Sequence, residues 1–198
     1  MIDMLSLELR SPGPKTRGGL VPTNRFDATE LIRNAKADEL RTICHIHKEA
    51  FEGASEAKLV ELLHCNRKAN PSLVVTVAGE IVASVVFSPV TVTTAPKESN
   101  IAGLGPVAVL PEYQRRGIGS RLIRAGLDAC RAAQYGAVVV LGNPQFYLRF
   151  GFLPAMDYGL SNQYVQDAHF MIRELHANVL SNVSGMVRYS AEFRLAGC

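Results

Sequence analysis

The segment of this chain with the clearest chemical potential spans residues 107–120 and reads Val-Ala-Val-Leu-Pro-Glu-Tyr-Gln-Arg-Arg-Gly-Ile-Gly-Ser. It leads from an apolar, strand-like run through a loop into a segment with helical periodicity. Unpaired amides at a helix start lie at the positive end of the helix dipole, where they can bind phosphate. Gly117 and Gly119 keep Cβ atoms away from such a ligand, and Arg115 and Arg116 add positive charge. The spacing therefore predicts an anion site that suits a pyrophosphate.

Two common nucleotide motifs do not fit this loop. A P-loop requires Gly-x-x-x-x-Gly-Lys-Ser/Thr, and a dinucleotide-binding turn requires Gly-x-Gly-x-x-Gly. Leu122 occupies the third glycine position, and no Lys-Ser or Lys-Thr pair follows a glycine loop. NTP hydrolysis and NAD binding are therefore disfavoured. The remaining alternative is a tight turn between strand and helix that binds nothing.

The wider pattern resembles the GNAT superfamily of N-acetyltransferases, whose signature is Gln/Arg-x-x-Gly-x-Gly/Ala. Three matches occur in the family's order: Gln114-Arg-Arg-Gly-Ile-Gly119, the preceding Val109-x-Pro111, and the later Tyr147-x-x-x-Gly151-Phe152. The resemblance covers about residues 31–175. Phrases such as Leu-Gly-Pro-Val-Ala-Val at 104–109 are similar to the small bacterial branch labelled YhbS-like.

This resemblance implies an α/β (α+β) fold with a mixed, splayed sheet flanked by helices, and acetyl-CoA as co-substrate. A primary amine, on a small molecule or a protein, would attack the thioester directly in a ternary complex. Tyr147 would be the general acid that protonates the departing thiolate. The residues implied to bind the cofactor are Val107, Ala108 and Val109 along pantetheine, Arg115, Arg116, Gly117, Ile118, Gly119 and Ser120 at the pyrophosphate, and Asn143.

One departure from the family concerns the proton acceptor. Many relatives carry a glutamate on the strand that corresponds to residues 137–141, which here reads Ala-Val-Val-Val-Leu. Glu52, Glu98, Asp157 and His169 are candidate acceptors, and spacing selects none of them. The missing glutamate motivates a second hypothesis, a catalytically weak or inactive domain that binds acyl-CoA as a sensor. For Tyr147 the alternative role is a core aromatic beside its phenylalanine neighbours.

A group of cysteines and histidines could suggest a metal, but its spacing does not. His45 and His47 are two residues apart and diverge on a helix, so we expect no metal site there. The four cysteines are scattered and form no Cys-x-x-Cys pair, which favours reduced, mostly structural thiols.

The elements that must position these residues follow from periodicity and turn signals. The predicted helices cover about 40–51 with an Asp38 cap, 117–134 and 144–150, and a further helix runs from a Ser55 cap through Leu63 and is ended by Asn70 and Pro71. The predicted strands are 29–35, a hairpin of 72–78 and 81–94 that turns at Gly79 and Glu80, 101–109, 137–141, 169–175 and 186–189.

The strand at 101–109 should not form an unbroken ladder. Proline lacks a backbone donor and glycine is common at bulges, so Gly103, Gly105 and Pro106 predict a kink near Gly105. A kink there would splay this strand from a neighbour and open a slot for the cofactor arm.

The composition limits the class of protein. With 198 residues, 47% of them hydrophobic and 20% charged, the chain is typical of a globular protein. We expect a flexible leader at 1–25 and one domain at 26–198. A net charge of +3 does not favour a nucleic-acid partner, and no apolar run is long enough to span a membrane. No secretory signal is evident, so a cytoplasmic location is expected, and a homodimer through the C-terminal strands stays open.

Overall fold

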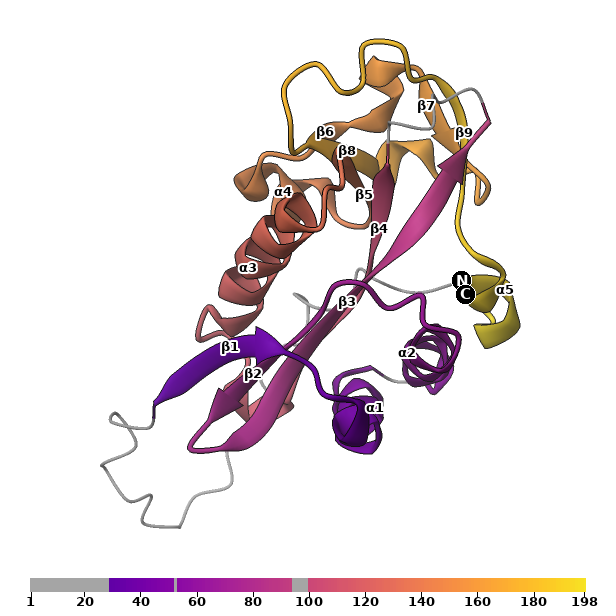
Figure 1. Ribbon diagram of the computed structural model, residues 1–198. Coiled ribbons are helices and arrows are strands. Elements are labelled where there is room, and N and C mark those ends of the chain that lie inside the picture. The colour runs from indigo at the N-terminus through magenta and orange to yellow at the C-terminus, as the bar shows by residue number, and fades with distance from the viewer. Residues whose placement is uncertain (1–28, 52, 94–99) are drawn as a thin grey trace, which may run out of the picture.

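A mixed β-sheet forms the centre of the protein in the computed structural model, which describes residues 29–51, 53–93 and 100–198 (Figure 1). The strands are β1 (Glu30–Asn34), β2 (Ser72–Val77), β3 (Glu80–Val92), β4 (Ile101–Val109), β5 (Ala137–Leu141), β6 (Leu153–Pro154), β7 (Leu160–Asn162), β8 (Phe170–Glu174) and β9 (Gly185–Arg188). Their order is β1-β2-β3-β4-β5-β8-β6, and β9 pairs with the end of β3 and with β7. Neighbours are antiparallel except for the parallel pairs β4–β5 and β7–β9.

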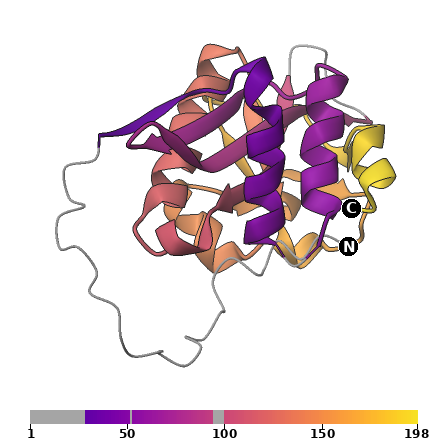
Figure 2. The ribbon, with the colours of Figure 1, turned by 90° about the horizontal axis from the view of Figure 1, so that it is seen from below.

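Helices cover both faces of this sheet (Figures 1 and 2). They are α1 (Leu40–Ala50), α2 (Ser55–Cys65), α3 (Ile118–Ala132), α4 (Pro144–Tyr147) and α5 (Ala191–Ala196), with short 3₁₀ turns at Ala37–Glu39, Pro111–Tyr113, Leu148–Phe150, Ala155–Tyr158 and Asp167–His169. Figure 2 shows α1 and α2 side by side, with α5 beside α2. They share one apolar cluster with the sheet, and α3 and α4 pack on the opposite face. The predicted fold class is confirmed.

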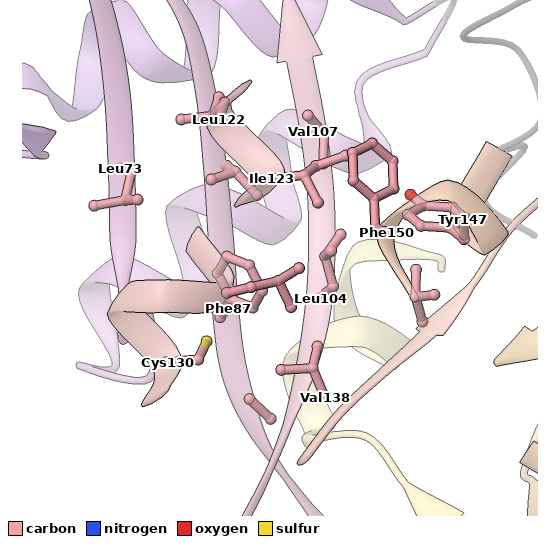
Figure 3. Close-up of a cluster of buried hydrophobic side chains, with 14 of the residues drawn as sticks. Leu73, Phe87, Leu104, Val107, Leu122, Ile123, Cys130, Val138, Tyr147 and Phe150 are labelled. Atoms are coloured by element: carbon pink, nitrogen blue, oxygen red, sulfur yellow. The ribbon is translucent and has the colours of Figure 1, made fainter. Parts of the chain in front are cut away.

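Helix α3 follows β4 and precedes β5, so these three elements form the expected strand-helix-strand unit. Its apolar stripe, Ile118, Leu122, Ile123, Leu127 and Cys130, is buried against the sheet, as Figure 3 shows for three of these residues. Gly126 allows close packing because a Cβ atom there would clash with the ring of Phe87. The middle of α3 is thereby packed closely onto β3.

Several details differ from the sequence-based expectations. The hairpin turns at Ala78 and Gly79, both with positive φ, because Val77 pairs with Glu80. Neither predicted cap is made: Ser55 is the first residue of α2, and the carboxylate of Glu39 accepts the Lys36 amide at the turn that precedes α1. Sequence reasoning also missed β6, β7 and α5, which are too short to show a period. The predicted leader, residues 1–25, lies outside the described residues.

Strand β4 is bulged and splayed where the sequence predicts it. Its register against β3 shifts so that Gly105 and Pro106 together face Val86. A Cβ atom on Gly105 would lie 3.0 Å from the Val86 carbonyl oxygen, so the bulge requires a residue without a side chain. Pairing with β5 covers only Ile101–Gly103 of β4, and the two strands diverge beyond it (Figure 1). The far half of β4 therefore borders a gap in the sheet.

Candidate acetyl-CoA site

The loop between β4 and α3 turns through Gly117, which caps the helix with φ of +76°. This left-handed conformation costs about 1–2 kcal/mol for a residue with a side chain. The first intrahelical bond runs from the Arg121 amide to the Gly117 carbonyl oxygen, at 3.1 Å. The amides of Ile118, Gly119 and Ser120 precede that bond, so they point out of the helix end, where its dipole is positive.

These amides border a cavity of about 380 Å³. Residues from β4, the loop, the first turn of α3 and the segment after β5 form its wall. They are Val109, Tyr113, Gln114, Arg115, Gly117, Ile118, Gly119, Ser120, Phe146 and Arg149. Two arginines beside a helix N-terminus make this a cationic site that suits a phosphate group.

The arginines of this region have different roles. Arg115, with φ of +60°, and Arg149 both line the cavity, and the Arg149 guanidinium lies 3.9 Å from the centre of the Phe146 ring. Arg116 is not among the lining residues: its guanidinium donates to the Glu112 carbonyl oxygen at 2.7 Å and lies over the Tyr113 ring. Its side chain therefore stabilises the conformation of the loop.

The backbone of β4 presents alternate residues to the gap. The Leu110 amide donates to the Val82 carbonyl oxygen at 2.9 Å, so even-numbered residues at this end of β4 bond to β3. The peptide groups of Val107 and Val109 consequently face away from β3, toward the gap, while those of Ala108 face β3. Gln114 donates to the Val109 carbonyl oxygen at 3.0 Å, which leaves the Val107 peptide groups and the Val109 amide for a ligand.

Tyr147, the last residue of α4, is 3% exposed and lies on the other side of the gap. Figure 3 shows its hydroxyl group pointing toward the strand that carries Leu104 and Val107. Its ring makes edge contacts with the rings of Phe146 and Phe152. A Cβ atom on Gly142 would lie 2.5 Å from the Tyr147 ring, so the residue at 142 also fixes the ring position. Tyr147 is thus both part of the core and next to the gap.

Asn143 holds α4 in place. Its Oδ1 accepts the Gln145 amide at 3.0 Å, and its carbonyl oxygen accepts the amides of Phe146 and Tyr147. Asn143 is not among the residues that line the cavity. In this structure it positions Tyr147.

Strand β5 carries no carboxylate: its five residues are apolar, and four of them are buried. Of the candidate proton acceptors, Glu52 and Glu98 lie outside the described residues. Asp157 is exposed on the turn after β6, and His169 lies on the turn before β8. Neither lines the cavity.

The histidines near the cysteines have structural partners. His47 is fully buried with Nε2 2.7 Å from Ser84 Oγ, and burial lowers its pKa to about 3. His64 Nε2 lies 3.1 Å from Ser72 Oγ. Among the described residues, no three His, Cys, Asp or Glu side chains are placed to hold a metal ion. Within that same part of the chain, no helix is long and apolar enough to cross a bilayer.

The structure brings six of the predicted cofactor residues to one cavity: Val109, Arg115, Gly117, Ile118, Gly119 and Ser120. It adds Tyr113, Gln114, Phe146 and Arg149, which the sequence-based prediction did not include. Gln114 is the first residue of the motif at 114–119, so the sequence does carry a signal for it. For Arg149 no sequence signal existed, because its approach to α3 depends on the divergence of β4 and β5.

Comparison with known proteins agrees with this geometry. The family model for the acetyltransferase (GNAT) domain matches residues 31–155. The chain is 34% identical over 148 residues to the uncharacterized N-acetyltransferase YhbS of Escherichia coli K12, covering 74% of this chain and 87% of that protein. It is 33% identical over 153 residues to YjhQ of the same strain, covering 74% and 84%.

Two solved structures are also similar. The crystal structure of E. coli YhbS in complex with CoA matches with a TM-score of 0.80 and 32% identity, covering 84% of this chain and 93% of that one. A GNAT acetyltransferase from Brucella melitensis in complex with acetyl-CoA matches with a TM-score of 0.70 and 30% identity, covering 84% and 99%. The resemblance to the YhbS-like branch is therefore confirmed, and this chain belongs to the GNAT family of N-acetyltransferases.

Proposed function

We propose that this protein transfers the acetyl group of acetyl-CoA directly to a primary amine within a ternary complex. The observation that carries the proposal is the cationic cavity at the start of α3, next to the unpaired backbone of β4. A pyrophosphate bound by the amides of residues 118–120 would let the pantetheine arm extend along Val107 and Val109. The complexes of E. coli YhbS with CoA and of the Brucella protein with acetyl-CoA support this choice of co-substrate.

The reaction needs two contributions from the chain. The amine nitrogen attacks the thioester carbonyl carbon, and a β4 amide that faces the gap can stabilise the oxyanion that develops. As the carbon–nitrogen bond forms and the carbon–sulfur bond breaks, the Tyr147 hydroxyl donates its proton to the leaving thiolate. A phenol has a pKa near 10 and a thiol one near 8.5, so this transfer depends on close positioning of the ring. The proton lost by the amine passes to water.

The packing of Tyr147 supports its assignment as the acid. Three features place its ring beside the gap: the Asn143 cap, the missing side chain at Gly142 and the edge contact with Phe152. Asn143 therefore acts in this proposal through Tyr147. Arg115 and the first turn of α3 would bind the phosphate groups, and Arg116 would stabilise the loop conformation.

Acetyl transfer to a panel of primary amines, followed by the release of free thiol, tests the proposal. Tyr147→Phe should lower kcat by about 10²- to 10⁴-fold, the usual contribution of a general acid. CoA affinity, measured by calorimetry, should change less than about threefold because the hydroxyl does not contact the phosphate site. Undiminished turnover in this variant would exclude Tyr147 as the acid.

A CoA-binding sensor without turnover is the second candidate, and the apolar β5 strand favours it. The same experiment separates the two. Tight CoA binding without thiol release for any amine in the panel would favour the sensor, whereas amine-dependent thiol release would exclude it.

A further inference from the structure

Two buried hydroxyl groups lie on the face of the sheet opposite Tyr147. Tyr189, just beyond β9, and Ser88, within β3, have side-chain oxygens that are buried and have no hydrogen-bond partner within the described part of the chain. A buried hydroxyl without a partner costs about 1–3 kcal/mol, so such groups are uncommon unless a ligand or water satisfies them. Their place in the fold suggests which ligand.

Both residues flank Gly103, the last β4 residue that pairs with β5. Ser88 faces Gly103 directly across the β3–β4 ladder, so the two residues share a face of the sheet. A Cβ atom on Gly103 would lie 2.7 Å from the Tyr189 ring, so the ring packs directly onto the backbone there. Gly103 pairs with Val139, and beyond this pair β4 and β5 separate. Ser88 and the ring of Tyr189 therefore lie beside the last residue of β4 that pairs with β5.

Tyr147 and Tyr189 lie on opposite faces of the sheet. Tyr147 belongs to the apolar cluster on the α3 face, and Tyr189 belongs to the cluster on the face of α1, α2 and α5. Burial first, and then the proximity of Tyr164 and Tyr147, raise the pKa of Tyr189. The proposed acid, Tyr147, thus lies on one face of the sheet, and the unpartnered phenol of Tyr189 lies on the other.

We propose that the hydroxyl groups of Tyr189 and Ser88 bind the amino group of the acceptor where β4 and β5 separate, on the sheet face opposite Tyr147. This inference rests on the proposed acetyl transfer. Hydroxyl oxygens accept hydrogen bonds from N–H groups, which leaves the nitrogen lone pair directed at the thioester carbonyl. The Tyr189 phenol stays protonated throughout, so it positions the amine and does not remove its proton.

Steady-state kinetics of Tyr189→Phe test this assignment. The probes are acetyl-CoA with butylamine, ethanolamine, spermidine or hydroxylamine, and the amine with the highest kcat/KM for wild type is used for the variants. We expect the KM for that amine to rise at least about tenfold, as for the loss of one hydrogen bond to a charged or polarised group. The KM for acetyl-CoA should stay within about twofold.

The matched control is Tyr135→Phe, which removes the hydroxyl of another buried tyrosine that follows α3. It should leave the amine KM unchanged. Thermal unfolding of Tyr189→Phe should occur at or above the wild-type temperature, because the ring is kept and an unpartnered hydroxyl is lost. Ser88→Ala is the second variant, and it decides the question alone if Tyr189→Phe does not fold.

The outcomes separate this inference from the function on which it rests. An unchanged amine KM in both Tyr189→Phe and Ser88→Ala would overturn the inference and leave acetyl transfer intact, with water as the partner of these hydroxyls. Wild-type protein that acetylates none of the amines would overturn both. A raised amine KM in the tyrosine control as well would also overturn the inference, since the effect would then be general.

Discussion

Replacing Gly119 with valine separates phosphate binding from folding. Gly119 lies in the first turn of α3 and lines the cationic cavity. A Cβ atom there would lie 3.6 Å from Val109 Cγ2, which is an ordinary van der Waals contact. Alanine therefore fits, and it should stabilise the protein by about 0.5–1 kcal/mol because glycine is a poor helix former. In Gly119→Val, Val109 blocks one side of the new side chain, so the additional methyl groups must extend into the cavity.

The expected loss of CoA affinity follows from the hydrogen bonds to phosphate that valine would disrupt. A hydrogen bond to a charged group contributes about 1.5–3 kcal/mol, so displacing a phosphate from one amide should raise the Kd for CoA about 10- to 100-fold. The unfolding temperature should stay within about 3 °C of the wild-type value, since valine and glycine differ little in helix propensity.

Isothermal titration calorimetry with CoA and thermal unfolding give the two readouts. Gly119→Ala is the matched control and should bind CoA within about threefold of wild type. Gly117→Ala should instead destabilise the fold. Residue 117 has a φ of +76°, so this variant should lose about 1–2 kcal/mol of stability. An unchanged Kd in Gly119→Val would refute the assignment of the phosphate site to the first turn of α3.

Two further predictions concern the fold around the site. Gly142→Ala places a Cβ atom 2.5 Å from the Tyr147 ring, so the ring must move; we expect a loss of about 1–3 kcal/mol in urea unfolding and a lower kcat with unchanged CoA affinity. A kcat equal to that of wild type would mean that the ring position is not critical. The second prediction concerns acid stability at α5. Burial alone would raise the pKa of Glu192, but hydrogen bonds from groups that include Lys68 and Asn66 lower it to about 2. The unfolded chain then binds this proton more readily, so this contribution to stability is present above about pH 4.5 and is lost as the pH falls toward 2. Urea unfolding of Glu192→Gln should show a smaller loss over that range, and an equal loss would contradict the reasoning.

Much of the fold was predictable because local signals were strong. The period of α3, the Val-rich hairpin and the apolar run of β5 identified those elements directly. The glycines and proline of β4 predicted the bulge, since they limit the backbone whatever the surroundings. The missed elements are short, and their stability comes from contacts with distant segments: α5, for example, is held to the segment after α2 through Glu192 and Lys68.

The same division applies to the site. The amino-acid sequence by itself determined the loop of residues 114–120, because its glycines, arginines and helix start specify an anion site locally. Tertiary structure decided which side chains complete it. Only the separation of β4 and β5 brings Arg149 to the cavity, and only the pairing of β9 with β3 places Tyr189 against Gly103. These contacts join residues far apart in the chain, and such proximity depends on strand register and helix packing, which no local pattern encodes.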